Sequence, residues 1–166
     1  AYPCALGYVH SSALLSITKL ANAQGILFKN PAVLERLHKI TMGVFSKQDA
    51  SVANRMDLVQ LTALDLYVEN ALPEFLPDGR VRAVVDLDPK EKAELIRSLR
   101  WGGERTLVYG NKISDMPLLA SGDVGVAVQN SAADQFAHIS FPQDEPKLIL
   151  TALEISKKLS KIYKRN

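Results

Sequence analysis

The chain has 166 residues, 47% of them hydrophobic and 23% charged, which are ordinary proportions for one soluble globular domain. Its formal net charge of +2 is too small to indicate a nucleic-acid partner, and we predict none. The lone Cys4 excludes an internal disulfide framework. No run of about eighteen or more apolar residues is present, so we expect no complete membrane span.

Helix and strand patterns alternate from the N-terminus onward. Residues 11–24 have the apolar spacing of an amphipathic helix, and a short apolar run follows at 26–28. Asn30 then predicts an N-cap, with Pro31 at the first position of a second helix. The apolar run at 40–45 predicts a buried strand.

The middle of the chain is irregular at first and then becomes regular. Apolar positions over 52–70 favour a helix, and residues 81–87 predict a strand. Asp88 and Pro89 are typical of the start of a helix, which we expect over 90–101. The later expected elements are strands at 106–109, 124–128 and 138–141, helices at 114–120 and 130–137, and a long amphipathic helix after Pro146.

Short strands that alternate with helices predict an α/β fold with a parallel sheet flanked by helices. In such sheets ligands bind beyond the carboxyl ends of the strands. The loops that follow Phe45, Leu87 and Tyr109 are therefore the places where a functional site is expected.

Four segments of the chain resemble parts of one protein family. Residues 107–128, LVYGNKISDMPLLASGDVGVAV, resemble the hinge segment of P-type ATPases, and 82–92, RAVVDLDPKEK, resemble their Pro-x-x-Lys segment. Residues 3–37 resemble the heavy-metal subfamily around its Cys-Pro-Cys transport helix. The C-terminal LEISKKLSKIYKRN resembles the basic helix that returns the phosphorylation domain to the membrane. The four segments occur in the family's order, so the chain is similar to heavy-metal-transporting P-type ATPases.

This resemblance implies a haloacid-dehalogenase-like phosphorylation domain with helical extensions. It divides the chain into a helical segment at 1–38, an α/β core at 39–142 and a basic amphipathic helix at 143–166. Residues 48–80 stand where the family has its nucleotide-binding domain, so ATP is implied by resemblance only. The implied location is the cytosolic face of a membrane, with the membrane or membrane-embedded ATPase segments as partners.

The catalytic positions that the resemblance identifies are largely changed. Ser46 occupies the position of the family's aspartate nucleophile, Lys47 is retained, and Lys92 matches the lysine that reaches the phosphate. Serine cannot form an acyl phosphate and is a poor nucleophile without an adjacent base. Asp49 is the nearby carboxylate that a displaced nucleophile would use. On the residues alone, Lys92 is either a phosphate ligand or a surface lysine.

The magnesium loop of the family corresponds here to Gly110, Asn111 and Asp115, with Ser114 in place of an asparagine. One magnesium carboxylate is thus replaced by Asn111, for which a structural role in the loop is favoured, and magnesium binding is expected to be weakened. Asp115 either keeps a weak cation site or caps the helix that begins near Met116. In the transport motif Tyr2 replaces the first cysteine, so Cys4 is either a ligand of a transported heavy metal or a small buried hydrophobe.

We therefore expect a P-type ATPase-like domain that does not hydrolyse ATP and acts as a binding or regulatory module or as a remnant. Two alternatives stay open on the sequence. The chain is a part of a working metal-transporting ATPase, or it is a small soluble phosphatase that uses Ser46 or Asp49.

Overall fold

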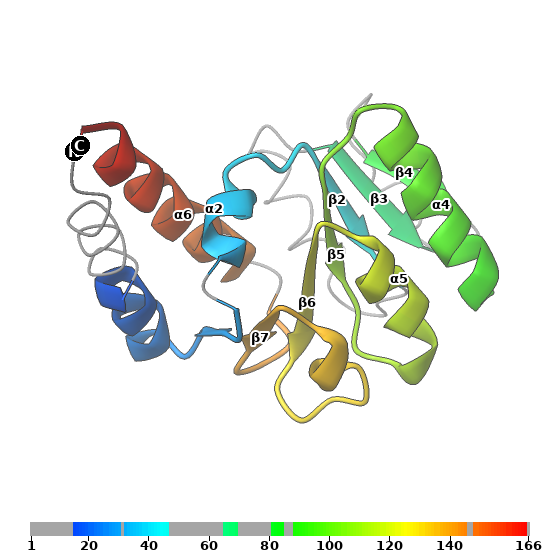
Figure 1. Ribbon diagram of the computed structural model, residues 1–166. Coiled ribbons are helices and arrows are strands. Elements are labelled where there is room, and N and C mark those ends of the chain that lie inside the picture. Colours follow the sequence, from blue (N-terminus) through cyan, green and yellow to red (C-terminus); the bar gives the residue numbers. More distant parts are fainter. Residues whose placement is uncertain are drawn as a thin grey trace.

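The computed structural model describes residues 15–30, 32–46, 65–69, 81–84, 88–145 and 148–165 (Figure 1). Its strands are β1 (Leu27–Phe28), β2 (Met42–Phe45), β3 (Asp65–Glu69), β4 (Val81–Val84), β5 (Thr106–Tyr109), β6 (Val124–Val128) and β7 (Ile139–Phe141). Its helices are residues 15–23, α2 (Val33–Leu37), α4 (Pro89–Trp101), α5 (Met116–Ser121) and α6 (Leu148–Arg165), with 3₁₀ turns at Ile113–Asp115 and Asp134–Phe136.

The described strands form one sheet in the order β1-β7-β6-β5-β2-β3-β4. Neighbouring strands run parallel except β1, which is antiparallel to β7. From β2 the chain builds outward through β3 to β4 and then crosses back to β5 on the other side of β2. The strand order therefore reverses between β2 and β5, and a parallel sheet places its ligand crevice at such a point.

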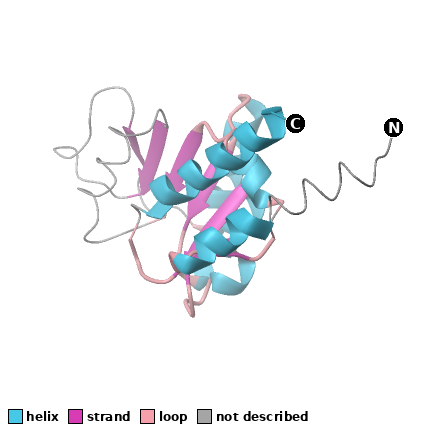
Figure 2. Ribbon diagram, turned by 90° about the vertical axis from the view of Figure 1, so that its left-hand side faces the viewer, coloured by secondary structure: helices cyan, strands magenta, loops and turns pink. Residues whose placement is uncertain are grey.

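Helices cover both faces of this sheet, as Figures 1 and 2 show. The helix at 15–23, α2 and α6 pack on one face, where the core includes Phe45, Tyr109 and Phe141. On the other face α4 and α5 pack over Val44 and Val108. Consecutive strand residues thus enter opposite cores, because side chains alternate along a strand. The predicted α/β architecture is confirmed.

The terminal helices share the larger of the two cores. Ile17 from the first helix and Leu159 from α6 belong to the same buried cluster as Phe45 of β2. Among the described residues no helix combines the length and apolar character that crossing a membrane requires. The described parts of both terminal segments therefore pack against the α/β core.

The start of α4 follows directly from its local sequence. The Asp88 side chain accepts a hydrogen bond from the Glu91 backbone N–H at 2.8 Å, and the Glu91 carboxylate accepts one from the Asp88 backbone N–H at 2.8 Å. Such a reciprocal capping box satisfies backbone donors that the first helical turn leaves unpaired. It fixes the orientation of the turn that carries Lys92.

Three expected elements differ from the structure. Residues 65–69, within the expected helix 52–70, form strand β3, because parallel pairing with β2 on one side and β4 on the other satisfies their backbone groups. Asn30 is not the N-cap of α2, because the cap is Ala32, whose backbone N–H donates to the Asn30 side chain at 3.1 Å. The expected helix over 130–137 is only a 3₁₀ turn, and Asn130 there has a φ of 64°.

Candidate functional site

Ser46 lies directly beyond the end of β2, at the point where the strand order reverses. Its backbone N–H donates to the Tyr109 carbonyl at 3.0 Å, which extends the pairing of β2 with β5 by one residue. The residue is only 2% exposed. The serine side chain is thereby held at the carboxyl edge of the sheet, where the resemblance placed the nucleophile.

Asp115 is the centre of the site. It ends the 3₁₀ turn that follows β5 and is 1% exposed. Its Oδ1 accepts hydrogen bonds from Ser46 Oγ at 2.5 Å and from Lys92 Nζ at 3.0 Å, and its Oδ2 accepts from the Lys112 backbone N–H at 3.0 Å. Asp115 occupies the N-cap position of α5, as expected, but its side chain makes no capping hydrogen bond to that helix. The Oδ2 contact instead caps the 3₁₀ turn at Ile113–Asp115.

Lys92 comes from the first turn of α4 and reaches across to the loop after β5. Its side chain is 7% exposed and forms an ion pair with Asp115. The surface-lysine interpretation of this residue is therefore wrong. A buried ammonium and a buried carboxylate at 3.0 Å balance each other's charge, so the Ser46–Lys92–Asp115 cluster as a whole is neutral.

Gly110 allows this arrangement because it has no side chain. A Cβ at this position would lie 2.8 Å from the Cβ, Cγ and Oδ2 atoms of Asp115, closer than side chains tolerate. The loop can fold back over the sheet edge only with glycine here.

Asn111 fastens the loop to the neighbouring strand. Its side-chain oxygen accepts a hydrogen bond from the Val128 backbone N–H at 2.8 Å. The amide oxygen thus holds the loop against the end of β6.

The described residues around Asp115 do not fit a magnesium ion as they stand. Magnesium takes oxygen ligands in a near-octahedral arrangement and favours carboxylates. The described loop offers one carboxylate, whose Oδ1 already accepts from a lysine and a serine and whose Oδ2 accepts from a backbone N–H. No cluster of three or more potential ligands among histidine, cysteine, aspartate and glutamate is found in the described ranges.

Several predicted site residues lie outside the described residues. They are Tyr2 and Cys4 of the transport motif and Lys47 and Asp49 of the phosphorylation loop. The roles expected for them stay predictions.

Curated relatives of the chain are metal-transporting ATPases. A copper-exporting P-type ATPase of Vibrio cholerae is 29% identical over 110 residues, which cover 65% of this chain and 12% of that protein. The chloroplastic copper-transporting ATPase PAA2 of Arabidopsis thaliana is 33% identical over 82 residues, 46% of this chain and 9% of that protein. Over these segments the chain is similar in sequence to heavy-metal P-type ATPases. No profile of a known protein family matches it.

Two solved structures of metal-transporting ATPases share the fold of this chain. A zinc-transporting PIB-type ATPase in its E2.Pi state superposes with a TM-score of 0.83 at 11% identity, over 98% of this chain and 48% of that chain. The catalytic domain of the CPx-ATPase CopB-B gives a TM-score of 0.63 at 12% identity, over 88% of this chain and 98% of that chain. The fold is the haloacid-dehalogenase-like fold of P-type ATPase domains.

The chain corresponds to a small part of its full-length relatives. The matched segments make up 12% of the Vibrio cholerae protein and 9% of the Arabidopsis thaliana protein. The transport activity of the full-length proteins is therefore not assigned to this chain.

One group of polar residues was missed by the sequence analysis. It lines a pocket between the end of α2 and the face of α6, with His38 and Lys39 on one wall and Ser160 and Lys164 on the other. The four-residue spacing of Ser156, Ser160 and Lys164 places them on one helix face, and this spacing was the signal available in the sequence.

Proposed function

We propose that this chain is the phosphorylation-domain-like part of a heavy-metal-transporting P-type ATPase relative and that it does not form a phosphoenzyme. The proposal rests on one observation. At the position of the expected nucleophile, the Ser46 hydroxyl donates to Asp115, which Lys92 neutralises. The chain would then act as a binding or regulatory module or as a remnant at the cytosolic face of a membrane.

The chemistry of phosphoryl transfer explains why this arrangement supports an inactive site. Catalysis of this reaction comes almost entirely from positioning and from cations that stabilise the charge on the transferred group. Among the described residues Lys92 supplies the cation at the sheet edge, where it forms an ion pair with Asp115 at 3.0 Å. Asn111 supplies no charge and is bound to the Val128 backbone. Among the described residues the site thus has neither a carboxylate nucleophile nor a donor set suited to magnesium.

Incubation with magnesium and either ATP or acetyl phosphate tests the proposal, because acetyl phosphate needs no nucleotide-binding domain. The wild-type chain should give no acid-stable phosphoprotein with either donor. The variant Ser46→Asp/Asn111→Asp restores two carboxylates, and its melting temperature should rise with added magnesium because a bound ion stabilises the folded state. Ser98→Asp makes the same serine change at an exposed position of α4 and should not respond.

The stability of the phosphoprotein bond separates the possible results. A wild-type phosphoprotein that resists hydroxylamine would carry its phosphate on a hydroxyl group, and its loss in Ser46→Ala would identify Ser46 as the nucleophile. That result would favour the small phosphatase, which the 2.5 Å hydrogen bond between these two residues permits. A hydroxylamine-labile product would place the phosphoryl group on a carboxylate such as Asp49. Either product would refute the inactive site.

A second candidate function is that the chain belongs to a working metal-transporting ATPase. The small share of the relatives' length that it matches, 12% and 9%, fits this alternative as well as the first. Sequencing the coding region on both sides decides between them. Flanking membrane spans together with an aspartate codon at position 46 would support the working transporter, and a serine codon there would support the inactive domain.

A further inference from the structure

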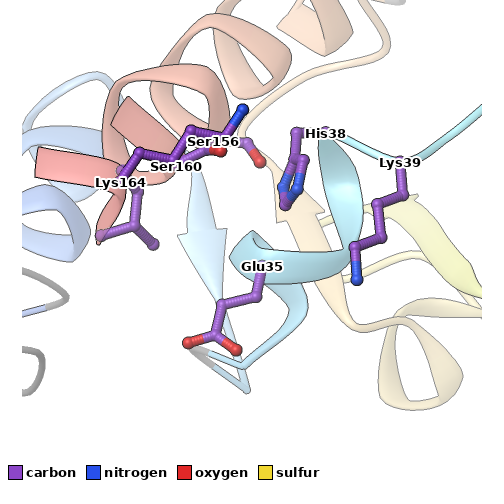
Figure 3. A pocket seen from close by; sticks show the side chains of 7 residues that line it. Glu35, His38, Lys39, Ser156, Ser160 and Lys164 are labelled. Atoms are coloured by element: carbon purple, nitrogen blue, oxygen red, sulfur yellow. The ribbon is translucent and has the colours of Figure 1, made fainter. Parts of the chain in front are cut away.

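A pocket of about 300 Å³ opens between the end of α2 and the C-terminal half of α6 (Figure 3). The Ser156 hydroxyl, on the pocket wall, donates to the Leu34 carbonyl and so ties the two helices together. Leu159 contributes an apolar surface to the lining. The pocket lies on the sheet face opposite α4, away from the Ser46 cluster, so a ligand bound there would not depend on the proposed function.

The charges around this pocket are mostly positive. Lys39 and Lys164 contribute two cations and Glu35 one anion, while His38 adds a further positive charge when protonated. None of these four side chains is in an ion pair within the described ranges. Cations that lack protein partners around a polar hollow favour an anionic ligand.

The pKa of His38 reflects the charges around the pocket. Burial lowers the pKa of its imidazole first, then the charges of Lys39 and Lys164 lower it further, while Glu35 acts in the opposite direction with the smallest effect. The two lysines together therefore outweigh the one carboxylate at the position of the ring. Figure 3 shows the imidazole between the α2 and α6 walls of the pocket.

The hydrogen-bond donors suit a ligand with several acceptor oxygens. Each lysine presents an ammonium, and the partly buried Ser160 hydroxyl forms no hydrogen bond within the described part of the chain. A protonated His38 adds two N–H donors. Lysine ammonium groups bind phosphate as point charges and tolerate varied ligand orientation.

We propose that the pocket between α2 and α6 binds a phosphate group, carried by a free phosphate or by a phospholipid headgroup. The two lysines and Glu35 leave one net positive charge, which a singly charged phosphate group balances. A phosphate also offers more acceptor oxygens to these donors than a carboxylate does. The volume of about 300 Å³ lies at the small end of ligand pockets and accommodates a phosphate with a short attachment.

Titration of the 166-residue chain with inorganic phosphate, followed by calorimetry near neutral pH, tests the first source. Saturable binding is expected. Lys39→Ala and Lys164→Ala should each weaken it about tenfold, since each removes a charge-assisted contact. Lys158→Ala removes the same charge from an exposed position of α6 and should bind within about twofold of wild type.

Flotation with phosphatidylcholine vesicles containing phosphatidic acid tests the second source, with pure phosphatidylcholine as the control. Binding in either arm that Lys39→Ala and Lys164→Ala weaken and Lys158→Ala leaves intact supports the pocket and identifies the source. The proposal is wrong if neither the phosphate titration nor the vesicle flotation shows saturable binding. It is also wrong if all three alanine variants lose binding equally. Far-UV circular dichroism checks folding, and Lys39→Gln and Lys164→Gln provide milder versions of the same changes.

Discussion

Replacing Asp115 with asparagine should measure how strongly the buried charges at the sheet edge depend on each other. Asn keeps the shape of the side chain and an oxygen for the Ser46 hydroxyl, but it removes the charge that faces Lys92 at 3.0 Å. Both members of the pair are nearly buried, at 6% exposure for the lysine and 1% for the aspartate. Removing one partner of a buried ion pair costs about 3–5 kcal/mol. Since small domains are stable by about 5–15 kcal/mol, this loss is a large part of the total.

A double-mutant cycle isolates the interaction. Lys92→Met removes the cation, and Asp115→Asn/Lys92→Met leaves no unpaired charge at the site. The double variant should be more stable than Asp115→Asn alone, with a coupling free energy of about 2 kcal/mol. Lys90→Met makes the same lysine change at an exposed position of α4 and should stay within about 0.5 kcal/mol of wild type.

Urea unfolding followed by far-UV circular dichroism is the suitable assay. Tryptophan fluorescence would report little, because Trp101 is 90% exposed in the folded chain. A loss of less than about 1 kcal/mol in the free energy of unfolding for Asp115→Asn would show that the charges are well solvated and the site is not closed. Additive effects of Asp115→Asn and Lys92→Met would show the same.

Three further changes test other features of the fold. Gly110→Ala should destabilise the chain by about 1–3 kcal/mol in thermal unfolding, since its Cβ would lie 2.8 Å from the site carboxylate; a silent change would contradict the close approach. Burial, above all, holds the pKa of His138 below its ordinary 6.5, and its Nδ1 accepts from the Gly125 N–H at 2.8 Å. Unfolding therefore takes up a proton, so the free energy of unfolding should fall as the pH drops below about 6.5 and level off below the lower pKa of the folded state. His138→Asn keeps a hydrogen-bond acceptor and should reduce this dependence of the unfolding free energy on pH, measured by urea unfolding. An unchanged pH dependence would exclude this histidine as its source. Tyr109→Phe loses the 2.6 Å hydrogen bond from the phenol to Asp144 and should cost about 0.5–1.5 kcal/mol in the same assay, whereas a more stable variant would contradict that bond.

Elements with local signals were predictable from the sequence. The helix at Pro89–Trp101 begins with a capping box, and the strands at Thr106–Tyr109 and Val124–Val128 are apolar runs of the right length. Strand β3 was mistaken for part of a helix because a strand paired on both sides needs no alternation of polar and apolar residues. Short apolar runs of this kind do not distinguish strand from helix.

The candidate site was predictable only in part. Its residues were found by their resemblance to family segments, whereas the contacts among them depend on how β2, β5 and α4 come together. Ser46 and Asp115 are separated by 69 positions, and the bond between them depends on the pairing of Phe45 with Tyr109. The pocket at α2 depends on even more distant packing, since 122 positions separate Ser156 from Leu34.

The crowding at Gly110 also limits what such a loop can reveal about a sequence. Because the carboxylate of Asp115 fills the space where a Cβ would stand, packing alone selects glycine there. A relative would retain this residue after losing the power to transfer phosphoryl groups. For sequences of this fold, the glycine is therefore a poor guide to whether the site can transfer phosphoryl groups. The side-chain oxygens that the loop leaves free to bind a cation are a better guide.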